Sequence, residues 1–305
     1  MTPSAGIRAL LANAIDYAGL FPPTSLPLEQ ALGNHARYVR TSDADMLGAF
    51  VLPVAQFGAA EPFLHFFDEA HPFLVSALGA KCENEAAFGE QLADMAAAID
   101  RLHRVHGSRV RVEQIEMPLP PEVTDSLFRD SEKAFAGFSL RTFWESPIAQ
   151  AERVIEAMAS HRRLGGTCGF KLRTGGTTSA AFPTTVQVAE VLVAGATHDV
   201  PMKFTAGLHH PVRKFHASVD TKMHGFLNVL GAGLLAREED WDVPQTATML
   251  ADEDAAAFRF NDEGFSWRDW QIDTEDIEAD RVYITSFGSC SFDEPRDDLR
   301  ALHLL

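Results

Sequence analysis

The chain has few cysteines, and no two of them are close in the sequence. Cys82, Cys168 and Cys290 are the three cysteines among 305 residues, and no CxxC pair occurs. Small secreted folds that depend on disulfides have a denser, even set of cysteines. The sequence therefore predicts reduced thiols in a cytoplasmic protein. No base neighbours any of the three in the sequence, so they are expected to be structural rather than nucleophilic.

Long apolar runs and an excess of positive charge are also missing. No segment has the length and apolar character of a bilayer span, and the N-terminal segment lacks a basic stretch followed by a small-residue cleavage site. The formal net charge is −17. Nucleic acids and anionic membranes bind clusters of Lys and Arg. We therefore expect neither a nucleic-acid nor a membrane partner.

What the chain does contain is an alternation of short apolar runs with segments of helical periodicity. This pattern is typical of stacked βα units and predicts one α/β domain over residues 1–305, a (β/α)8 TIM barrel. Residues 214–280 interrupt the pattern, with a hairpin expected at 258–267, and are predicted to be an elaboration before the last strand, either an insertion or a lid. The expected strands are 14–21, 46–54, 73–80, 110–117, 138–145, 169–174, 202–208 and 282–291, and the expected helices are 28–39, 60–68, 85–106, 122–135, 149–163 and 184–194.

Lysine is scarce, with six lysines against twenty arginines, yet two lysines fall inside predicted strands. In GFKLRTGG (169–176) and MKFTAG (202–207), Lys171 and Lys203 each precede a glycine by four residues. Because side chains alternate along a strand, both lysines can face the barrel interior, on strands about 4.8 Å apart. Each charge then disfavours the other and burial acts in the same direction, so the pKa of at least one lysine is expected to fall. A neutral amine is a nucleophile toward carbonyl groups.

These two segments, with the helical segment between them, resemble strands six and seven of deoxyribose-phosphate aldolase and related class I aldolases. The resemblance covers about fifty of the 305 residues. It implies that Lys171 forms a Schiff base and that Lys203 perturbs it. It also implies an acidic residue on the fourth strand for proton transfer. Glu113 and Glu116 are the alternatives, and since they are three residues apart, only one of them can face the interior.

Further polar residues fall at predicted strand ends. Glu145 can act as a general acid or base, or form a structural ion pair with Lys171 or an arginine. Arg141 and Arg173 predict an anionic substrate, because guanidinium groups bind carboxylate and phosphate. His209 shares the strand face of Lys203 and is predicted to carry protons. The remaining expected substrate contacts are Asp16, Thr205, Gly175, Gly176 and Gly207.

The predicted function is that of a class I aldolase-like lyase without a cofactor or metal. In it, Lys171 forms a Schiff base with a small anionic carbonyl substrate, and Lys203, Glu116, Glu145 and His209 complete the catalytic set. Three alternatives stay open: a noncovalent acid-base isomerase or epimerase, a metal-dependent hydrolase or isomerase centred on His209 and His210, and a barrel that binds a small anion without turnover. A homo-oligomer is compatible with each of them.

Overall fold

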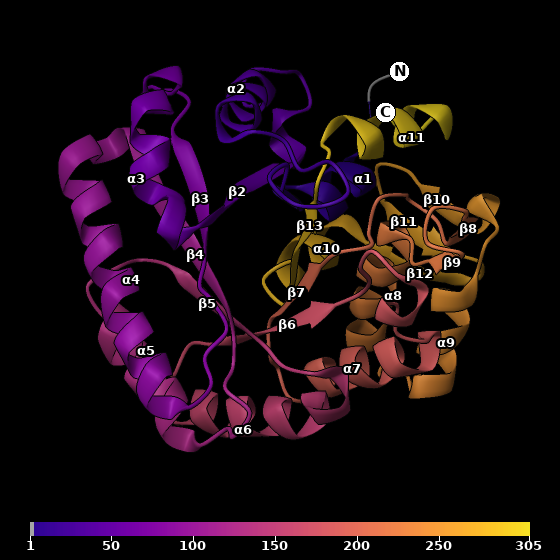
Figure 1. Cartoon of the computed structure of the whole chain (residues 1–305). Helices are drawn as coiled ribbons and strands as arrows, with labels where there is room; N and C mark the ends of the chain where they lie inside the picture. Colours follow the sequence, from indigo (N-terminus) through magenta and orange to yellow (C-terminus); the bar gives the residue numbers. More distant parts are fainter. Residues whose placement is uncertain (1–2) are drawn as a thin grey trace.

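The computed structural model describes residues 3–305, which form a closed parallel barrel of eight strands surrounded by helices (Figure 1). The strand order around the barrel is β1-β13-β7-β6-β5-β4-β3-β2, so each barrel strand pairs with its neighbours in chain order and the last pairs with the first. This is the predicted (β/α)8 TIM barrel. The barrel strands are β1 (Ile15–Tyr17), β2 (Leu47–Pro53), β3 (Phe73–Leu78), β4 (Val110–Pro118), β5 (Arg141–Glu145), β6 (Gly169–Arg173), β7 (Met202–Thr205) and β13 (Ile284–Ser289).

Helices between the strands cover the outside of the barrel (Figure 1). The second βα unit differs from the prediction of a helix at 60–68, because α3 ends at Ala60 and continues as a 3-10 helix over Glu61–Phe66. Pro62 has no amide hydrogen to donate, which favours a break at this point. The helices are α1 (Ala5–Leu11), α2 (Leu28–Tyr38), α3 (Phe57–Ala60), α4 (Glu85–His106), α5 (Asp125–Phe135), α6 (Ala151–Arg163), α7 (Thr185–Thr197), α8 (Phe226–Glu238) and α11 (Asp293–Ala301).

The longest helix, α4, follows from signals in its own sequence. The Asn84 side chain accepts a hydrogen bond from the Ala87 N–H at 2.9 Å, which caps the first turn. Gly107 takes a φ of +57° directly after the helix, a conformation that glycine adopts without strain. A stripe of apolar residues at helical spacing is buried: Phe88, Leu92, Met95, Ile99 and Leu102. The helix therefore packs through one face only.

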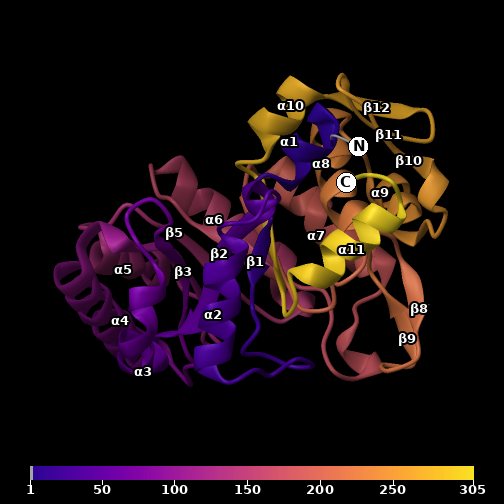
Figure 2. The same ribbon diagram turned by 90° about the horizontal axis from the view of Figure 1, so that it is seen from above.

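Residues 214–280 form the predicted elaboration between the seventh and eighth barrel strands. The expected hairpin at 258–267 is confirmed as β10 (Phe258–Phe260) and β11 (Gly264–Trp267), to which β12 (Trp270–Asp273) adds a third strand. Figure 2 shows this small sheet beside α1, where the Gly6 N–H donates to the Asn261 carbonyl at 3.0 Å. The remaining elements are the hairpin β8 (Lys214–His216) and β9 (Thr221–Met223), with α8, α9 (Val243–Ala251) and α10 (Thr274–Asp280).

The helix α8 explains why its sequence is apolar on several sides. Every residue from Phe226 to Ala236 is buried, because α8 packs against α7, α9, β12 and β13 at once. A helix surrounded by protein needs no polar face. Of the helices within residues 3–305, none combines the length and the apolar character that a bilayer span requires.

One buried side chain makes the core sensitive to acid. His35 of α2 is fully buried among aromatic rings, with its ring parallel to that of Tyr17 and edge-on to those of Phe50 and Phe73. Neither ring nitrogen has a hydrogen-bond partner. Burial lowers the pKa of His35 to about 3. His35 therefore binds a proton at a much lower pH in the folded state than in the unfolded chain.

We expect His35 to reduce the free energy of unfolding in mild acid. The folded-state pKa lies below the unfolded value of about 6.5, so stability is full above about pH 6.5 and declines toward pH 3. Between about pH 7.5 and pH 5, His35 should account for a loss of about 2 kcal/mol. His35→Leu should remove that part of the loss in urea unfolding at the two pH values. The exposed His65, changed to Gln, is the matched control, and an identical acid loss in all three proteins would contradict the interpretation.

Candidate active site

A cavity of about 520 Å³ opens at the C-terminal ends of the barrel strands and is called the upper cavity below. Active sites of TIM barrels lie at this end. Its walls come from the ends of the strands and from the loops that follow them, and include Lys171, Glu116 and Glu145. Within residues 3–305, no side chain of the elaboration at 214–280 lines the cavity, so a lid role for that segment stays a prediction.

Two lysines lie side by side in the barrel, as the sequence predicted. Lys171 on β6 pairs in register with Lys203 on β7 and, on its other side, with Glu145 on β5. Lys171 is 3% exposed and lines the cavity, whereas Lys203 is fully buried and does not. A ligand in the cavity can therefore touch only Lys171.

Carboxylates surround Lys171 and determine its charge. Its Nζ lies 2.9 Å from Glu116 Oε2 and 3.2 Å from Glu145 Oε2. Burial alone would lower the pKa of the Lys171 ammonium, but the two carboxylates outweigh burial and raise that pKa. The expectation of a lowered pKa is therefore wrong for Lys171. The repulsion from Lys203 does not lower the pKa of Lys171, because the Glu116 carboxylate lies between the two lysines.

Lys203 is held from below by Asp16 on β1. Its Nζ forms an ion pair with Asp16 Oδ2, lies 3.2 Å from Glu116 Oε1 and donates to Ser286 Oγ at 3.1 Å. The Gln114 side-chain amide also donates to Asp16, at 2.9 Å. Asp16, predicted to contact the substrate, is buried and does not line the upper cavity.

Glu116 is the fourth-strand acid of this cavity, and Glu113 is not. Glu116 bridges both lysines and accepts a hydrogen bond from the Ser76 hydroxyl. Burial would raise the pKa of the Glu116 carboxyl, but Lys171 and Lys203 lower it to about 2. Glu113 pairs with Arg111 and lines a different cavity. Side-chain alternation along β4 does not account for this separation, because the register of β4 shifts between Val112 and Gln114, and Glu113 and Gln114 both line that second cavity.

The arginines expected to hold substrate lie at opposite ends of the barrel. Arg173 lines the upper cavity, and its Nε donates to Glu145 Oε1 at 2.8 Å. The pKa of Glu145 is lowered, because Lys171 and Arg173 outweigh the opposing effect of burial. Arg141, also predicted to bind the substrate, lines another cavity and not this one. It shares a strand face with Glu145, but four residues of strand place it about 13 Å lower.

The glycines that follow the two lysines allow two loops to touch. A Cβ atom on Gly175 would lie 2.9 Å from the Cα of Gly207, and a Cβ on Gly207 would lie 2.9 Å from the Cα of Gly175. Strand β7 ends at Thr205, earlier than the expected residue 208, because Ala206 and Gly207 have φ values of +62° and +79°. Thr205, Gly175, Gly176 and Gly207 all line the cavity, as expected.

A cysteine and a histidine meet at the rim. Cys290, in the loop after β13, has its Sγ 3.8 Å from His209 Nδ1, and the same nitrogen lies 3.1 Å from Glu294 Oε2. Burial would lower the pKa of His209, but Cys290 and Glu294 raise it to about 9. The pKa of Cys290 is lowered, because the hydrogen bond with His209 outweighs burial. No base lies near Cys290 in the sequence, but His209 lies beside it in the structure, since loops distant in sequence meet here.

His209 and His210 contact different carboxylates. His210 Nδ1 lies 2.6 Å from Asp298, apart from the Glu294 that contacts His209. Residues 3–305 contain no group of three or more His, Cys, Asp or Glu side chains arranged to hold a metal ion. The metal-dependent alternative therefore has no ligand set in this part of the chain.

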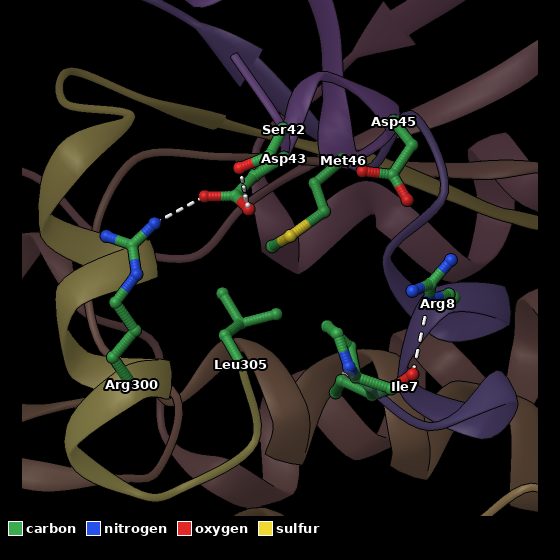
Figure 3. A pocket seen from close by; sticks show the side chains of 9 residues that line it. Ile7, Arg8, Ser42, Asp43, Asp45, Met46, Arg300 and Leu305 are labelled. Atoms are coloured by element: carbon green, nitrogen blue, oxygen red, sulfur yellow. Dashed lines mark hydrogen bonds and ion pairs between the residues drawn. The ribbon is translucent and has the colours of Figure 1, made fainter. Parts of the chain in front are cut away.

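Another cavity, of about 380 Å³, lies near the two chain ends. Figure 3 shows the Leu305 side chain pointing into it, with Ile7 and Met46 close by. Its Arg300 is paired with Asp43. The described lining includes no lysine, histidine or cysteine, so this cavity is a weaker candidate than the one at the strand ends.

Comparisons with known proteins leave the reaction open. No protein-family model and no curated protein sequence matches this chain. Among solved structures, it resembles a novel GH10 endoxylanase retrieved from sugarcane soil metagenome, with a TM-score of 0.38 and 13% sequence identity over 68% of this chain and 70% of that one. So weak a likeness carries no functional argument. The fold is assigned from the strand order around the barrel, and the candidate site is assigned from the geometry of its side chains.

Breaking the ion pair between Asp16 and Lys203 should destabilise the barrel. Asp16→Asn and Lys203→Met each leave a buried charge with fewer partners and should each lower the free energy of unfolding by about 3 kcal/mol. The double variant removes both charges and should lose less than the sum of the two single losses. Urea unfolding of the four proteins measures the coupling. Strictly additive losses would contradict the pairing.

Cys290 should be the most reactive thiol. We expect iodoacetamide to label it before Cys82 and Cys168, because burial raises the pKa of both other thiols, that of Cys168 to about 12. His209→Asn should slow the labelling of Cys290 about tenfold without changing the other two rates. Peptide mapping over time gives the three rates. Equal labelling of all three, or no effect of His209→Asn, would refute the assignment.

Proposed function

We propose that this chain is a lyase of the class I aldolase type, which forms a Schiff base between Lys171 and a small anionic carbonyl substrate. One observation carries the proposal: Lys171 is the lysine that lines the C-terminal cavity, and it lies between two carboxylates beside a second buried lysine. Proton transfer from the amine and to the substrate both need such carboxylates.

Substrate binding would depend on Arg173 and the small-residue loops. Arg173 is half exposed at the rim, where its guanidinium can bind a carboxylate or phosphate substituent. Gly175 and Gly176 let the backbone approach the ligand closely. A cavity of about 520 Å³ suits a compact metabolite rather than a polymer segment.

The first chemical step is formation of an iminium ion. Lys171 passes a proton to Glu145, which is 3.2 Å away and 14% exposed. A carbonyl group that enters between the two weakens the ion pair that raises the lysine pKa, which favours this transfer. The neutral amine adds to the carbonyl carbon, and the carbinolamine loses water to give the iminium.

Cleavage then breaks the bond between the carbons α and β to the iminium. The electron pair of that bond moves into the iminium and gives an enamine, while the β-hydroxyl proton passes to a carboxylate and an aldehyde leaves. Protonation of the enamine carbon and hydrolysis release the second product and the free lysine. His209, whose pKa is raised to about 9, lines the cavity as a proton donor.

Lys203 acts through Glu116 rather than on the substrate. It is fully buried and shares the Glu116 carboxylate with Lys171. Without Lys203, the Glu116 carboxylate would interact with Lys171 alone, and the pKa of the Lys171 ammonium would be higher. Lys203 is therefore a positioning residue that lowers the cost of deprotonating Lys171.

A second function is favoured by the raised pKa of Lys171. An ammonium that stays charged can stabilise an enolate without a covalent bond, while Glu145 removes and returns the proton on carbon. An acid-base isomerase or epimerase would use the same residues and form no adduct. The two functions differ in one observable, which is the trapped imine.

Borohydride trapping distinguishes them. The full chain is incubated with small aldehydes and 2-oxoacids, reduced, and analysed by intact mass and peptide mapping. We expect a reduced adduct on Lys171 that is absent in Lys171→Met and retained in Lys133→Met, a control on the exposed face of α5. Lys171→Met should also lose turnover by about a thousandfold or more, because it lacks the nucleophile.

The remaining outcomes are also informative. No adduct in a folded protein, together with loss of turnover in Lys171→Met, would select the noncovalent isomerase. An adduct on another lysine would overturn the assignment of Lys171. Full turnover in Lys171→Met would overturn both functions.

A further inference from the structure

The barrel has a second polar cavity at its opposite, N-terminal end. Its volume is about 470 Å³, and it is lined by the first residues of β2 to β5 and by β13 with the loop before it. The charged side chains around it are Asp16, Arg111, Glu113, Arg141 and Arg281. The mechanism proposed above uses none of the three arginines.

Only some of these charges are balanced. Arg111 pairs with Glu113, and Asp16 pairs with Lys203. Within residues 3–305, Arg141 and Arg281 form no ion pair, which leaves two positive charges at this cavity. The chain as a whole has a net charge of −17, so two uncompensated guanidinium groups at one cavity are unusual for it. Two positive charges at one site favour the binding of an anion there.

The contacts of the two arginines leave donors free. Arg141 donates to Gln114 Oε1 at 3.3 Å, its one hydrogen bond within the described part of the chain. Arg281 donates to the backbone carbonyls of Ala12, Ile284 and Thr285, while its Nε is buried without a partner. Arg141 and Arg281 line the same cavity, and burial together with the charge of Arg141 lowers the pKa of Arg281 to about 10, against the opposing effect of Asp16.

We propose that this N-terminal cavity binds a small oxyanion, a carboxylate or a phosphate group, between Arg141 and Arg281. Guanidinium groups donate in a planar fork that matches both kinds of anion. The anion would supply the missing negative charge.

This site would lie one side chain away from the catalytic ion pairs. Gln114 accepts from Arg141 through Oε1 and donates to Asp16 through its amide nitrogen at 2.9 Å. Asp16 in turn holds Lys203. An anion that draws Arg141 toward itself would weaken the hydrogen bond to Gln114, so its effect reaches the residue that supports Lys203.

Isothermal titration calorimetry of the full chain with two anions tests the site. Inorganic phosphate and malonate are each titrated into the wild type, Arg141→Gln and Arg173→Gln. We expect saturable binding of at least one probe, with a component that is weakened about tenfold or more by Arg141→Gln and retained in Arg173→Gln, a change confined to the upper cavity. The probe that binds more tightly identifies the oxyanion as phosphate or carboxylate.

Thermal unfolding confirms that each variant is folded. Arg281 is not substituted, since it holds the carbonyls at the start of β13 and its loss would disturb the strand. Binding that is lost only in Arg173→Gln would assign the anion to the upper cavity and overturn the proposal. So would binding that is unchanged in both variants, or no saturable binding in the millimolar range. None of these outcomes depends on whether Lys171 forms a Schiff base.

Discussion

An alternating row of charges, buried except at its Arg173 end, underlies the candidate site. It runs from Asp16 to Lys203, Glu116, Lys171, Glu145 and Arg173, on five of the eight barrel strands. Isolated ions of this kind are costly to bury, and removal of one partner exposes the full desolvation penalty of the other. Here each cation touches an anion on at least one side and the row sums to zero, with three charges of each sign. The barrel interior tolerates two lysines because the carboxylates separate them.

The same row limits what the lysine can do at rest. The carboxylates that allow Lys171 to be buried also raise its pKa, so the resting site holds an ammonium and not a nucleophile. Any covalent chemistry requires the substrate to change that balance, and Glu145 is the member of the row that is partly exposed and within reach. Lys203, which is sealed below the cavity, and Glu116, which lines it, continue the row on the other side of Lys171.

Patterns within single segments predicted much of this correctly. The alternation of apolar and polar residues in 169–176 and 202–207 was enough to place Lys171 and Lys203 in one layer. The same rule of alternation fails along β4, whose register shifts at Glu113. What the sequence could not provide were contacts that depend on barrel closure. Asp16 reaches Lys203 across β13, and Cys290 meets His209 through loops distant in sequence. Height along a strand was also missed, since Arg141 and Glu145 share a face but serve opposite ends.

The contact between Gly175 and Gly207 acts as a spacer. The loops after β6 and β7 meet through Cα atoms, with room for nothing larger than hydrogen. Their closeness helps set the separation of the strands that carry the two lysines. A methyl group at either glycine would push those strands apart without touching any reactive group. Intolerance to substitution at these two positions would therefore report the geometry of the lysine layer, and a survey of variants that equates sensitivity with chemistry would overlook this structural part of their role.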